Sequence, residues 1–436
     1  MIKHRGRLMA GVTVLALAGT AVTVVLERPD NGAGHRPKTA VAVESTAPEL
    51  PAGENAARRV QIDSLLAGRA RAVLKGDLKT FLAAVDPKQP ALMARQRTLF
   101  VNLRKFGFAS LQYTVADEWK AAAVLAKYGP TTISTRLMMR YRLAGLDSRP
   151  VQTDLGYSFV RRENQWVLVE DGAFDEVLSA TGHRQPWDFQ EVAIIRRGSL
   201  VIAVEKTEKA LGTRIARVSQ KAVQAVRRHW PRPWSGAVLV VAMSEQRVMA
   251  SRWQGGTGGG TTISAKAVTL YDVDPRGNPT VGPVGSRIVI NPAVRKTLDG
   301  EVLVHELTHV ATTPLGHYAP DWLVEGLAEH VRLATIEDDP EWTVDPYRNT
   351  VRTKYLPTME VLPDSNEFRR HGAQAYARGW WAVEYLVSKA GVNGMASLYA
   401  DLAVHTTGPA AYSATMKRHT GMTPAGFTAA VKTFKG

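Results

Sequence analysis

The sequence predicts an α+β protein in which an N-terminal apolar helix precedes two folded domains. Its 436 residues are too many for one ordinary hydrophobic core. Apolar residues recur at helical spacing in both halves of the chain, whereas residues 131–143 alternate with a period of two. We therefore expect a small α+β domain at 56–180 and a mainly helical domain with a small sheet at 185–436.

The composition excludes several classes of protein. A hydrophobic fraction of 45% and a charged fraction of 22% are typical of globular proteins rather than of disordered ones. The formal net charge is +15, but lysine and arginine are spread along the chain and no nucleic-acid motif is present. We therefore expect a solvated basic surface and no nucleic-acid partner. Cysteine is absent, which leaves histidine and carboxylate side chains as the ligands of any zinc ion.

The first 55 residues predict export of the chain. Lys3, Arg5 and Arg7 precede an uncharged, mostly apolar run at 8–26, whose length just suffices to cross a bilayer as a helix. This signal anchor, at 1–26, predicts a single-pass protein of the cell membrane with its C-terminal domains outside the cell. The alternative is a cleaved signal peptide and a secreted protein. Residues 27–55, rich in proline, glycine and alanine, predict a flexible linker.

The first domain begins with helical patterns and continues with strand patterns. Helical patterns are found at 56–85 and 95–106, and strand patterns at 131–143, 155–160 and 166–169. In the longest strand, Ile133, Leu137 and Tyr141 fall on one face, and Arg136 and Arg140 fall on the other. This order resembles the cone-shaped fold of nuclear transport factor 2-like domains, in which a curved sheet wraps over helices. The resemblance implies a spacer or a ligand-binding module.

The second domain begins with elements that carry no recognisable chemistry. We expect a helix at 205–229 and strands at 237–243 and 287–290. A glycine-rich stretch at 255–260 lies between the strands, but no Gly-Lys-Ser/Thr sequence follows it, as a phosphate-binding loop requires. We interpret this stretch as a surface loop.

The residues His305-Glu306-Leu307-Thr308-His309 follow the last of these strands. Two histidines four residues apart lie about 40° apart in projection on a helix, so their imidazoles can converge on one metal ion. Glu306 projects about 100° from His305, on the substrate side, where it can accept a proton from the attacking water. Asp299 can cap the start of this helix, and Pro314 can end it. The alternative is a buried amphipathic helix that carries two histidines by chance.

A second helix, expected to begin near Asp321, carries the sequence Trp322-Leu323-Val324-Glu325-Gly326. Together the two motifs resemble the gluzincins, zinc metallopeptidases that include the aminopeptidases of the M1 type. In that family the glutamate of the second motif completes the zinc site. The resemblance implies a thermolysin-like peptidase fold, with Glu306 as the catalytic base. The zinc ligands that it implies are His305, His309 and Glu325.

Two further residues of this domain are candidates for the same site. Glu329 lies one turn after Glu325, as a further ligand, a hydrogen-bond partner of a zinc-bound histidine, or a surface carboxylate. The segment at 371–380 resembles a Tyr-x-Lys/Arg-Gly element of the family, and the matching residue is Tyr376. The resemblance implies that Tyr376 donates a hydrogen bond to the oxyanion formed during peptide hydrolysis. A packed core tyrosine is the alternative, and His371 is a weaker candidate for this role.

The predicted function is zinc-dependent hydrolysis of a polypeptide substrate, at the outer membrane face or outside the cell. The Gly-x-Met-Glu-Asn element with which the aminopeptidases hold a free amino end is absent from the sequence, so we expect an endopeptidase. The strand at 288–290 is expected to align the substrate as an added strand. The alternative is a membrane-tethered ligand-binding protein with a non-catalytic zinc site.

Overall fold

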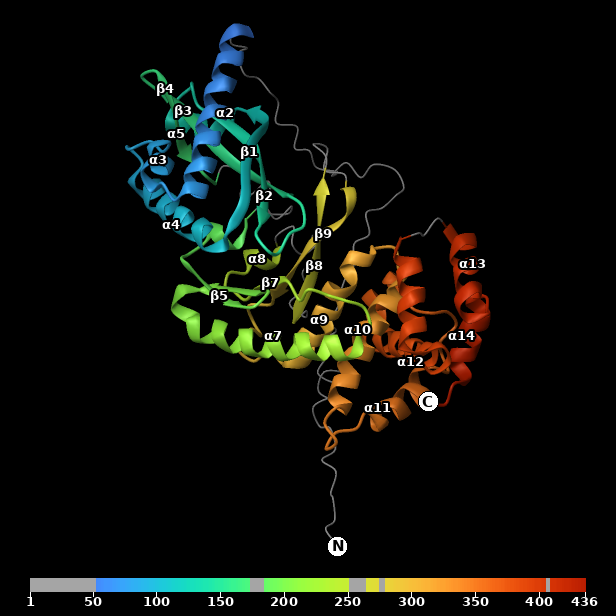
Figure 1. Cartoon of the computed structure of the whole chain (residues 1–436). Coiled ribbons are helices and arrows are strands. Elements are labelled where there is room, and N and C mark those ends of the chain that lie inside the picture. Colours follow the sequence, from blue (N-terminus) through green and yellow to red (C-terminus); the bar gives the residue numbers. More distant parts are fainter. Residues whose placement is uncertain (1–51, 173–183, 251–263, 274–278, 405–407) are drawn as a thin grey trace.

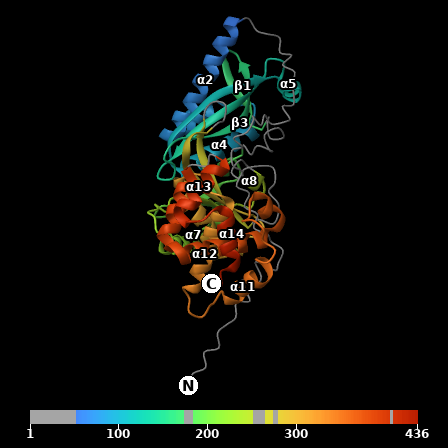
Figure 2. The ribbon, with the colours of Figure 1, turned by 90° about the vertical axis from the view of Figure 1, so that its right-hand side faces the viewer.

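The computed structural model describes residues 52–172, 184–250, 264–273, 279–404 and 408–436. The predicted membrane helix at 8–26, most of the predicted linker and the glycine-rich stretch at 255–260 lie outside these residues. The first domain forms one end of the molecule and the C-terminal helices form the other (Figure 1 and Figure 2).

The first domain consists of a four-stranded antiparallel sheet and the helices packed against it. The helices are α2 (Ala52–Lys75), α3 (Leu78–Ala83), α4 (Pro90–Phe106) and α5 (Ala122–Tyr128). The strands, in their order across the sheet, are β1 (Phe108–Trp119), β2 (Ile133–Leu143), β3 (Val151–Arg162) and β4 (Gln165–Glu170). The sequence patterns identify β2, β3 and β4, but not β1 or α5.

The second sheet is five-stranded and mixed. Its strands are β5 (Val192–Arg197), β6 (Leu200–Glu205), β7 (Val238–Val241), β8 (Ala265–Val273) and β9 (Pro279–Ile290). Their order is β5-β6-β7-β9-β8, with parallel pairs in the middle and an antiparallel pair at each edge. The crossover that a parallel pair requires is α7 (Lys209–His229), between β6 and β7. The prediction that residues 288–290 align a substrate is therefore wrong, because β9 is paired on both sides. Among the described strands, β8 has no partner on its other side and so has an open edge, as β5 does at the far side of the sheet.

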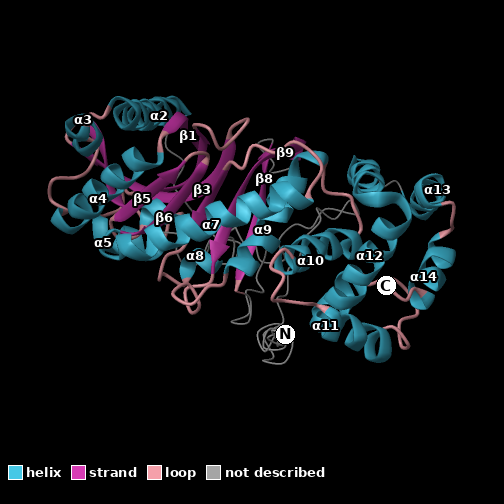
Figure 3. Ribbon diagram, turned by 60° about the horizontal axis from the view of Figure 1, so that its bottom comes forward, coloured by secondary structure: helices cyan, strands magenta, loops and turns pink. Residues whose placement is uncertain are grey.

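The remaining helices cover one face of this sheet or extend from it. They are α9 (Gly300–Thr312), α10 (Asp321–Glu337), α11 (Asp345–Thr350), α12 (Ser365–Val404), α13 (Gly408–Thr420) and α14 (Pro424–Thr433). Short helical turns are η2 (Pro186–Asp188), η3 (Lys206–Glu208), α8 (Arg247–Ala250), η5 (Thr313–Leu315) and η6 (Val351–Tyr355). Helices α7 and α9 pack together on the same face of the strands (Figure 3). Helix α12 departs from helical geometry at His371 and at Gly391.

The second sheet is buried on both faces, and the first domain covers one of them. Along β6, Ile202 packs toward the helices of the second domain, whereas Val201 packs into the core of the first. The junction between the two domains is also packed, since Trp187 is fully buried. Its ring lies 5.0 Å from that of Phe106 and 5.2 Å from that of Tyr141. The second sheet thus has a core on each face, and the core of the first domain extends onto one of them.

The predicted fold class requires two corrections. It included a transmembrane helix, and none of the helices in the described part of the chain is long and apolar enough to cross a membrane. The long helices α2 and α7 carry charged residues throughout, as helices with one solvated face do. The second sheet, expected to be small, has five strands with parallel pairs, so the architecture is mixed α/β.

Candidate metal centre

Helix α9 carries the motif at 305–309 into the core of the second domain. Asp299 caps the helix, because its side chain accepts a hydrogen bond from the backbone N–H of Glu301. Leu303 and Leu307 are fully buried in the core that α9 shares with α7 and α10. The helix is buried from its third residue onward, so both histidines and the glutamate of the motif are shielded from bulk water.

Glu325 on α10 faces both histidines of α9. Its Oε2 atom lies 3.3 Å from Nε2 of His305 and 3.5 Å from Nε2 of His309. The two Nε2 atoms are 3.1 Å apart. The exposed fractions of Glu325, His305 and His309 are 1%, 4% and 7%. Three buried donor atoms from two helices thus form a nearly equilateral triangle.

The triangle has the dimensions of a tetrahedral zinc site. Zinc–ligand distances near 2.0–2.1 Å place neighbouring ligand atoms about 3.3–3.4 Å apart in a tetrahedron. The three observed separations of 3.1, 3.3 and 3.5 Å bracket that value. Neither oxygen of Glu325 accepts a hydrogen bond from another described residue, although both are buried. A carboxylate in this position is suited to a shared cation, and two histidines with one carboxylate leave a fourth coordination position open.

The electrostatics of the triangle favour positive charge. Burial alone lowers the pKa of His305, but the nearby carboxylates of Glu325 and Glu329 outweigh it and raise that pKa to about 10. Burial raises the pKa of Glu325, but the charges of His309 and His305 hold that pKa below its ordinary value. The pocket therefore stabilises a cation between its carboxylates, which is what a divalent metal ion requires.

Glu329 holds the opposite side of the His305 ring. Its Oε1 atom lies 2.8 Å from Nδ1 of His305. With a metal ion in the triangle, this contact would keep the ring proton on Nδ1 and leave the lone pair of Nε2 for the metal. Arg332 fixes Glu329 in turn, with Nη2 donating to Oε2 at 2.6 Å, and Nη1 donates to Glu301 at 3.0 Å. Glu329 is 7% exposed, so it is not a surface carboxylate, and it contacts Nδ1 of His305 rather than the Nε2 atom that belongs to the triangle.

Glu306 is fully buried and contacts the second sheet. Its Oε2 atom accepts a hydrogen bond of 2.6 Å from the backbone N–H of Ala267 on β8. Its Oε1 atom accepts none from the described residues. Burial raises the pKa of Glu306 above its ordinary value, against the lowering effect of the charges on His305 and His309. One oxygen is thus anchored, and the other has no hydrogen-bond partner among the described residues.

Tyr376 on α12 reaches the centre as well. Its ring packs edge-on against His305, with centroids 5.9 Å apart, and against Phe368 at 5.1 Å. The side chain is buried, so it packs in the core and also borders the candidate ligand His305. His371, the weaker candidate, has an exposed side chain at the kink of α12, which does not suit the same role.

Two glycines allow the helices that carry Glu325 and Tyr376 to cross in contact. A Cβ atom on Gly326 of α10 would lie 2.5 Å from the carbonyl carbon of Gly379 on α12. A Cβ atom on Gly379 would lie 3.0 Å from the carbonyl oxygen of Trp322. The glycine in each of the two sequence motifs is therefore required by packing, and this packing sets the position of Glu325.

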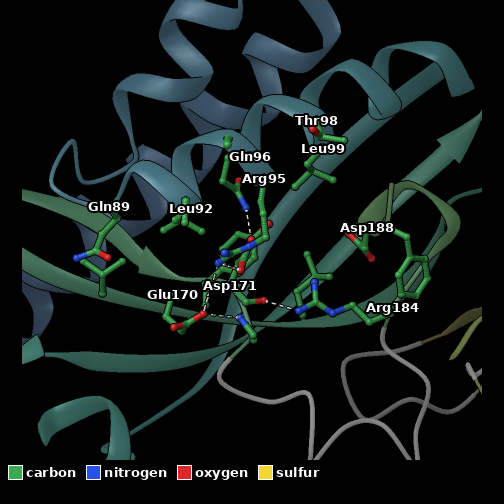
Figure 4. Close-up of a pocket in the computed structure, with 18 of the residues that line it drawn as sticks. Gln89, Leu92, Arg95, Gln96, Thr98, Leu99, Glu170, Asp171, Arg184 and Asp188 are labelled. Carbon is green, nitrogen blue, oxygen red and sulfur yellow. Dashed lines mark hydrogen bonds and ion pairs between the residues drawn. The ribbon is translucent and has the colours of Figure 1, made fainter. Parts of the chain in front are cut away.

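A second feature, in the first domain, is not predicted by the sequence patterns. A cavity of about 1140 Å³ is bordered by α4, α5, β3 and β4 and by residues at 184–190 and 245–247. Its wall holds a polar network around Asp171, whose carboxylate accepts from Arg95 at 2.9 Å and from Gln96 at 2.7 Å (Figure 4). The backbone carbonyl of Asp171 accepts from Arg184 at 3.1 Å. These residues come from segments far apart in the sequence, so no local sequence motif predicts the network.

Neither the models of known protein families nor the curated proteins match this sequence. The resemblance to the gluzincins therefore rests on the motif residues between 305 and 379. The chemistry that these residues can perform follows from the distances and burial described above.

Proposed function

We propose that the protein is a zinc-dependent peptidase of the gluzincin type. The observation that carries this proposal is the buried triangle of His305, His309 and Glu325 with the carboxylate of Glu306 next to it. Structural zinc sites are closed by four protein ligands. Three ligands with an adjacent buried base are instead the set that hydrolysis requires, because one position stays open for water.

Each residue around the triangle has a separate role in the proposed reaction. A zinc ion held there would acidify a water ligand and polarise the substrate carbonyl. Glu306 accepts the proton of the attacking water and then delivers it to the leaving amine. The backbone N–H of Ala267 keeps the carboxylate of Glu306 in one orientation during both transfers. Tyr376 donates a hydrogen bond to the oxyanion that develops on the carbonyl, and Glu329 holds the ring of His305.

The open edge of β8 supports an extended polypeptide as the substrate. Ala267 connects this edge directly to Glu306. In an antiparallel pair, backbone groups of alternate residues point away from the partner strand, and Ala267 and Thr269 are two of these on β8. The N–H of Ala267 is bonded to Glu306, which leaves the carbonyl of Ala267 and the backbone groups of Thr269 to pair with an extended peptide. Because β8 continues on both sides of Ala267, a substrate strand can extend in both directions from the scissile bond, as internal cleavage requires.

The variant Glu306→Gln tests this proposal. Zinc-loaded protein is incubated with casein, cleavage is followed by mass spectrometry, and bound zinc is measured in parallel. We expect Glu306→Gln to keep its zinc and to lose a factor of about 10²–10⁴ in rate. The matched control Glu341→Gln changes an exposed carboxylate and should cleave at the wild-type rate. Full activity of Glu306→Gln would remove Glu306 from its role, and a zinc-loaded wild type that cleaves no peptide would end the proposal.

A second candidate function is ligand binding with a non-catalytic zinc site. The cavity in the first domain favours it, since about 300–1,000 Å³ already accommodates a small organic ligand and this cavity measures about 1140 Å³. The casein assay separates the two candidates. Stoichiometric zinc without proteolysis in the wild type would favour binding, whereas cleavage that depends on Glu306 favours the peptidase.

A further inference from the structure

Three aromatic rings gather at one end of the open edge of β8. Tyr271 belongs to β8, and His317 and Tyr318 lie in the turn between η5 and α10. The ring centroid of His317 is 5.4 Å from that of Tyr271 at an interplanar angle of 86°. It is 4.1 Å from that of Tyr318 at an angle of 35°. We term these three residues the aromatic cluster, and all of them are partly exposed.

A short path of contacts connects the aromatic cluster to the metal centre. Thr313, directly after α9, donates a hydrogen bond of 2.9 Å to the carbonyl of His309. Its hydroxyl oxygen lies 3.4 Å from that of Thr269 on β8. Thr269 is therefore level with the last turn of the histidine-bearing helix. Tyr271 is two residues further along β8, about 7 Å at the rise of a strand.

The backbone of β8 is irregular where the cluster begins. Its pairing with β9 shifts register between Leu270 and Tyr271 and again before Val273. Such irregularities occur next to active sites, where they re-aim a side chain. Val268 and Leu270 pack into the core that includes the first domain, whereas the ring of Tyr271 contacts His317. The strand thus presents an aromatic ring on the side of α9 and α10.

We infer that the aromatic cluster is a specificity subsite, which takes an aromatic or branched aliphatic side chain of the substrate two to four residues from the scissile bond. The inference rests on the proposed peptidase function. Ala267 lies beside Glu306, and Thr269 and Tyr271 are two and four residues further along β8. In a substrate strand paired with β8, the residue opposite Thr269 is therefore two residues from the reacting carbonyl, and the residue opposite Tyr271 is four residues from it.

The chemistry of the cluster determines which side chain it takes. Partly exposed rings bind most favourably to an apolar side chain that covers them. Aromatic pairs also prefer offset or edge-to-face packing of the two rings. Burial raises the pKa of Tyr271 to about 12, which indicates that water is scarce around its hydroxyl. A cationic side chain also has affinity for ring faces, but the net charge of +15 opposes its approach.

The preference is measured by digesting a library of unstructured peptides with the zinc-loaded full chain and mapping cleavage sites by mass spectrometry. We expect Phe, Tyr, Trp, Leu and Ile to be enriched at one position, two to four residues from the scissile bond and on one side of it. Tyr271→Ala and His317→Ala should each reduce this enrichment by about tenfold, as loss of an apolar pocket contact does. Tyr271→Phe, which keeps the ring, should retain it.

Kinetics on matched substrates separate a loss of specificity from a general loss of activity. Two peptides that differ only in Phe or Asp at the selected position should differ in kcat/KM with the wild type and become similar with Tyr271→Ala. A shorter peptide that ends before this position cannot reach the cluster, so Tyr271→Ala should cleave it at the wild-type rate. The control Tyr128→Ala removes a partly buried tyrosine of the first domain and should leave the Phe/Asp ratio unchanged.

The outcomes distinguish this inference from the function on which it rests. A zinc-loaded wild type that cleaves no peptide refutes the peptidase function itself. Cleavage with an unchanged apolar preference in Tyr271→Ala and His317→Ala overturns the subsite alone, as does a wild-type preference for Lys or Arg at that position. If Tyr271→Ala does not fold, His317→Ala, which alters a turn residue, provides the same comparison.

Discussion

The crossing of α10 and α12 makes the metal centre sensitive to a single added methyl group. In Gly326→Ala, the new Cβ atom would lie 2.5 Å from the carbonyl carbon of Gly379 and 3.0 Å from Cγ2 of Val383. Carbon atoms prefer separations of about 3.5–4.0 Å, so the two helices have to move apart by about 1 Å. Zinc–ligand distances tolerate about 0.2 Å, and Glu325 is the adjacent residue. The shift is therefore large enough to draw this carboxylate out of the triangle.

We expect Gly326→Ala to weaken zinc binding by about 10–100-fold, the size of effect seen when the surroundings of a zinc ligand are disturbed. Overpacking should also lower the free energy of unfolding by about 1–3 kcal/mol. Zinc affinity is measured by competition with a chromogenic chelator, and stability by urea denaturation of the zinc-free protein. Gly379→Ala, whose Cβ atom would lie 3.0 Å from the carbonyl oxygen of Trp322, should have smaller effects on both quantities.

Gly68→Ala is the matched control for these variants. Gly68 lies inside α2, and the nearest atom to its added Cβ would be Nη2 of Arg71 at 4.0 Å. The substitution should stabilise the protein by up to about 1 kcal/mol through helix propensity and leave zinc affinity unchanged. A folded Gly326→Ala protein with wild-type zinc affinity would refute the link between this crossing and Glu325. If Gly326→Ala does not fold, Gly379→Ala carries the same test.

Three more predictions concern the surroundings of the metal centre. Glu329→Gln removes the charge that faces Nδ1 of His305, so zinc affinity in the chelator assay should fall about tenfold; an unchanged affinity would assign Glu329 to packing alone. Asp147→Asn leaves the guanidinium of Arg287 buried without its counter-charge, since both side chains are 0% exposed. Urea denaturation should then show a loss of about 3–5 kcal/mol, and a loss under about 1 kcal/mol, as at an exposed pair, would contradict this. Zinc at about a thousand times its Kd stabilises a protein by about 4 kcal/mol, so chelation should lower the Tm of the wild type but not of His309→Ala.

The candidate metal ligands can be predicted from the sequence because their geometry is local. Two histidines one turn apart on a helix share a face in any fold, and Glu325 follows on the next helix within a Trp-Leu-x-Glu-Gly sequence that resembles a known family, although the interval from His309 is shorter than in its aminopeptidases. The cap at Asp299 likewise needs only its own helix to form. The hydrogen bond from Ala267 to Glu306 is different, because a backbone N–H has no sequence signature. Its position depends on the pairing of β8 with β9, which is a property of the whole sheet.

The sequence patterns fail in the first domain for two separate reasons. Strand β1 contains the alternation of a half-buried strand at Leu111, Tyr113 and Val115, so its signal is present but is not recognised next to the helical pattern before it. The packing of the first domain on the second sheet is missed for another reason. The apolar run of β6 predicts a strand buried on both faces, but such a run does not indicate which element covers Val201. Only the arrangement of the two domains settles that.

The first domain supports the position of the strand next to the candidate metal centre. The buried pair of Asp147 with Arg287 ties the turn after β2 to β9, which pairs with β8. A second contact, from Arg140 to Asp272 at 2.6 Å, ties β2 directly to β8. Strand β8 in turn holds the carboxylate of Glu306 through Ala267 and carries one ring of the aromatic cluster. The first domain therefore supports the strand that orients the proposed base, so a spacer that could be removed without consequence does not fit these contacts.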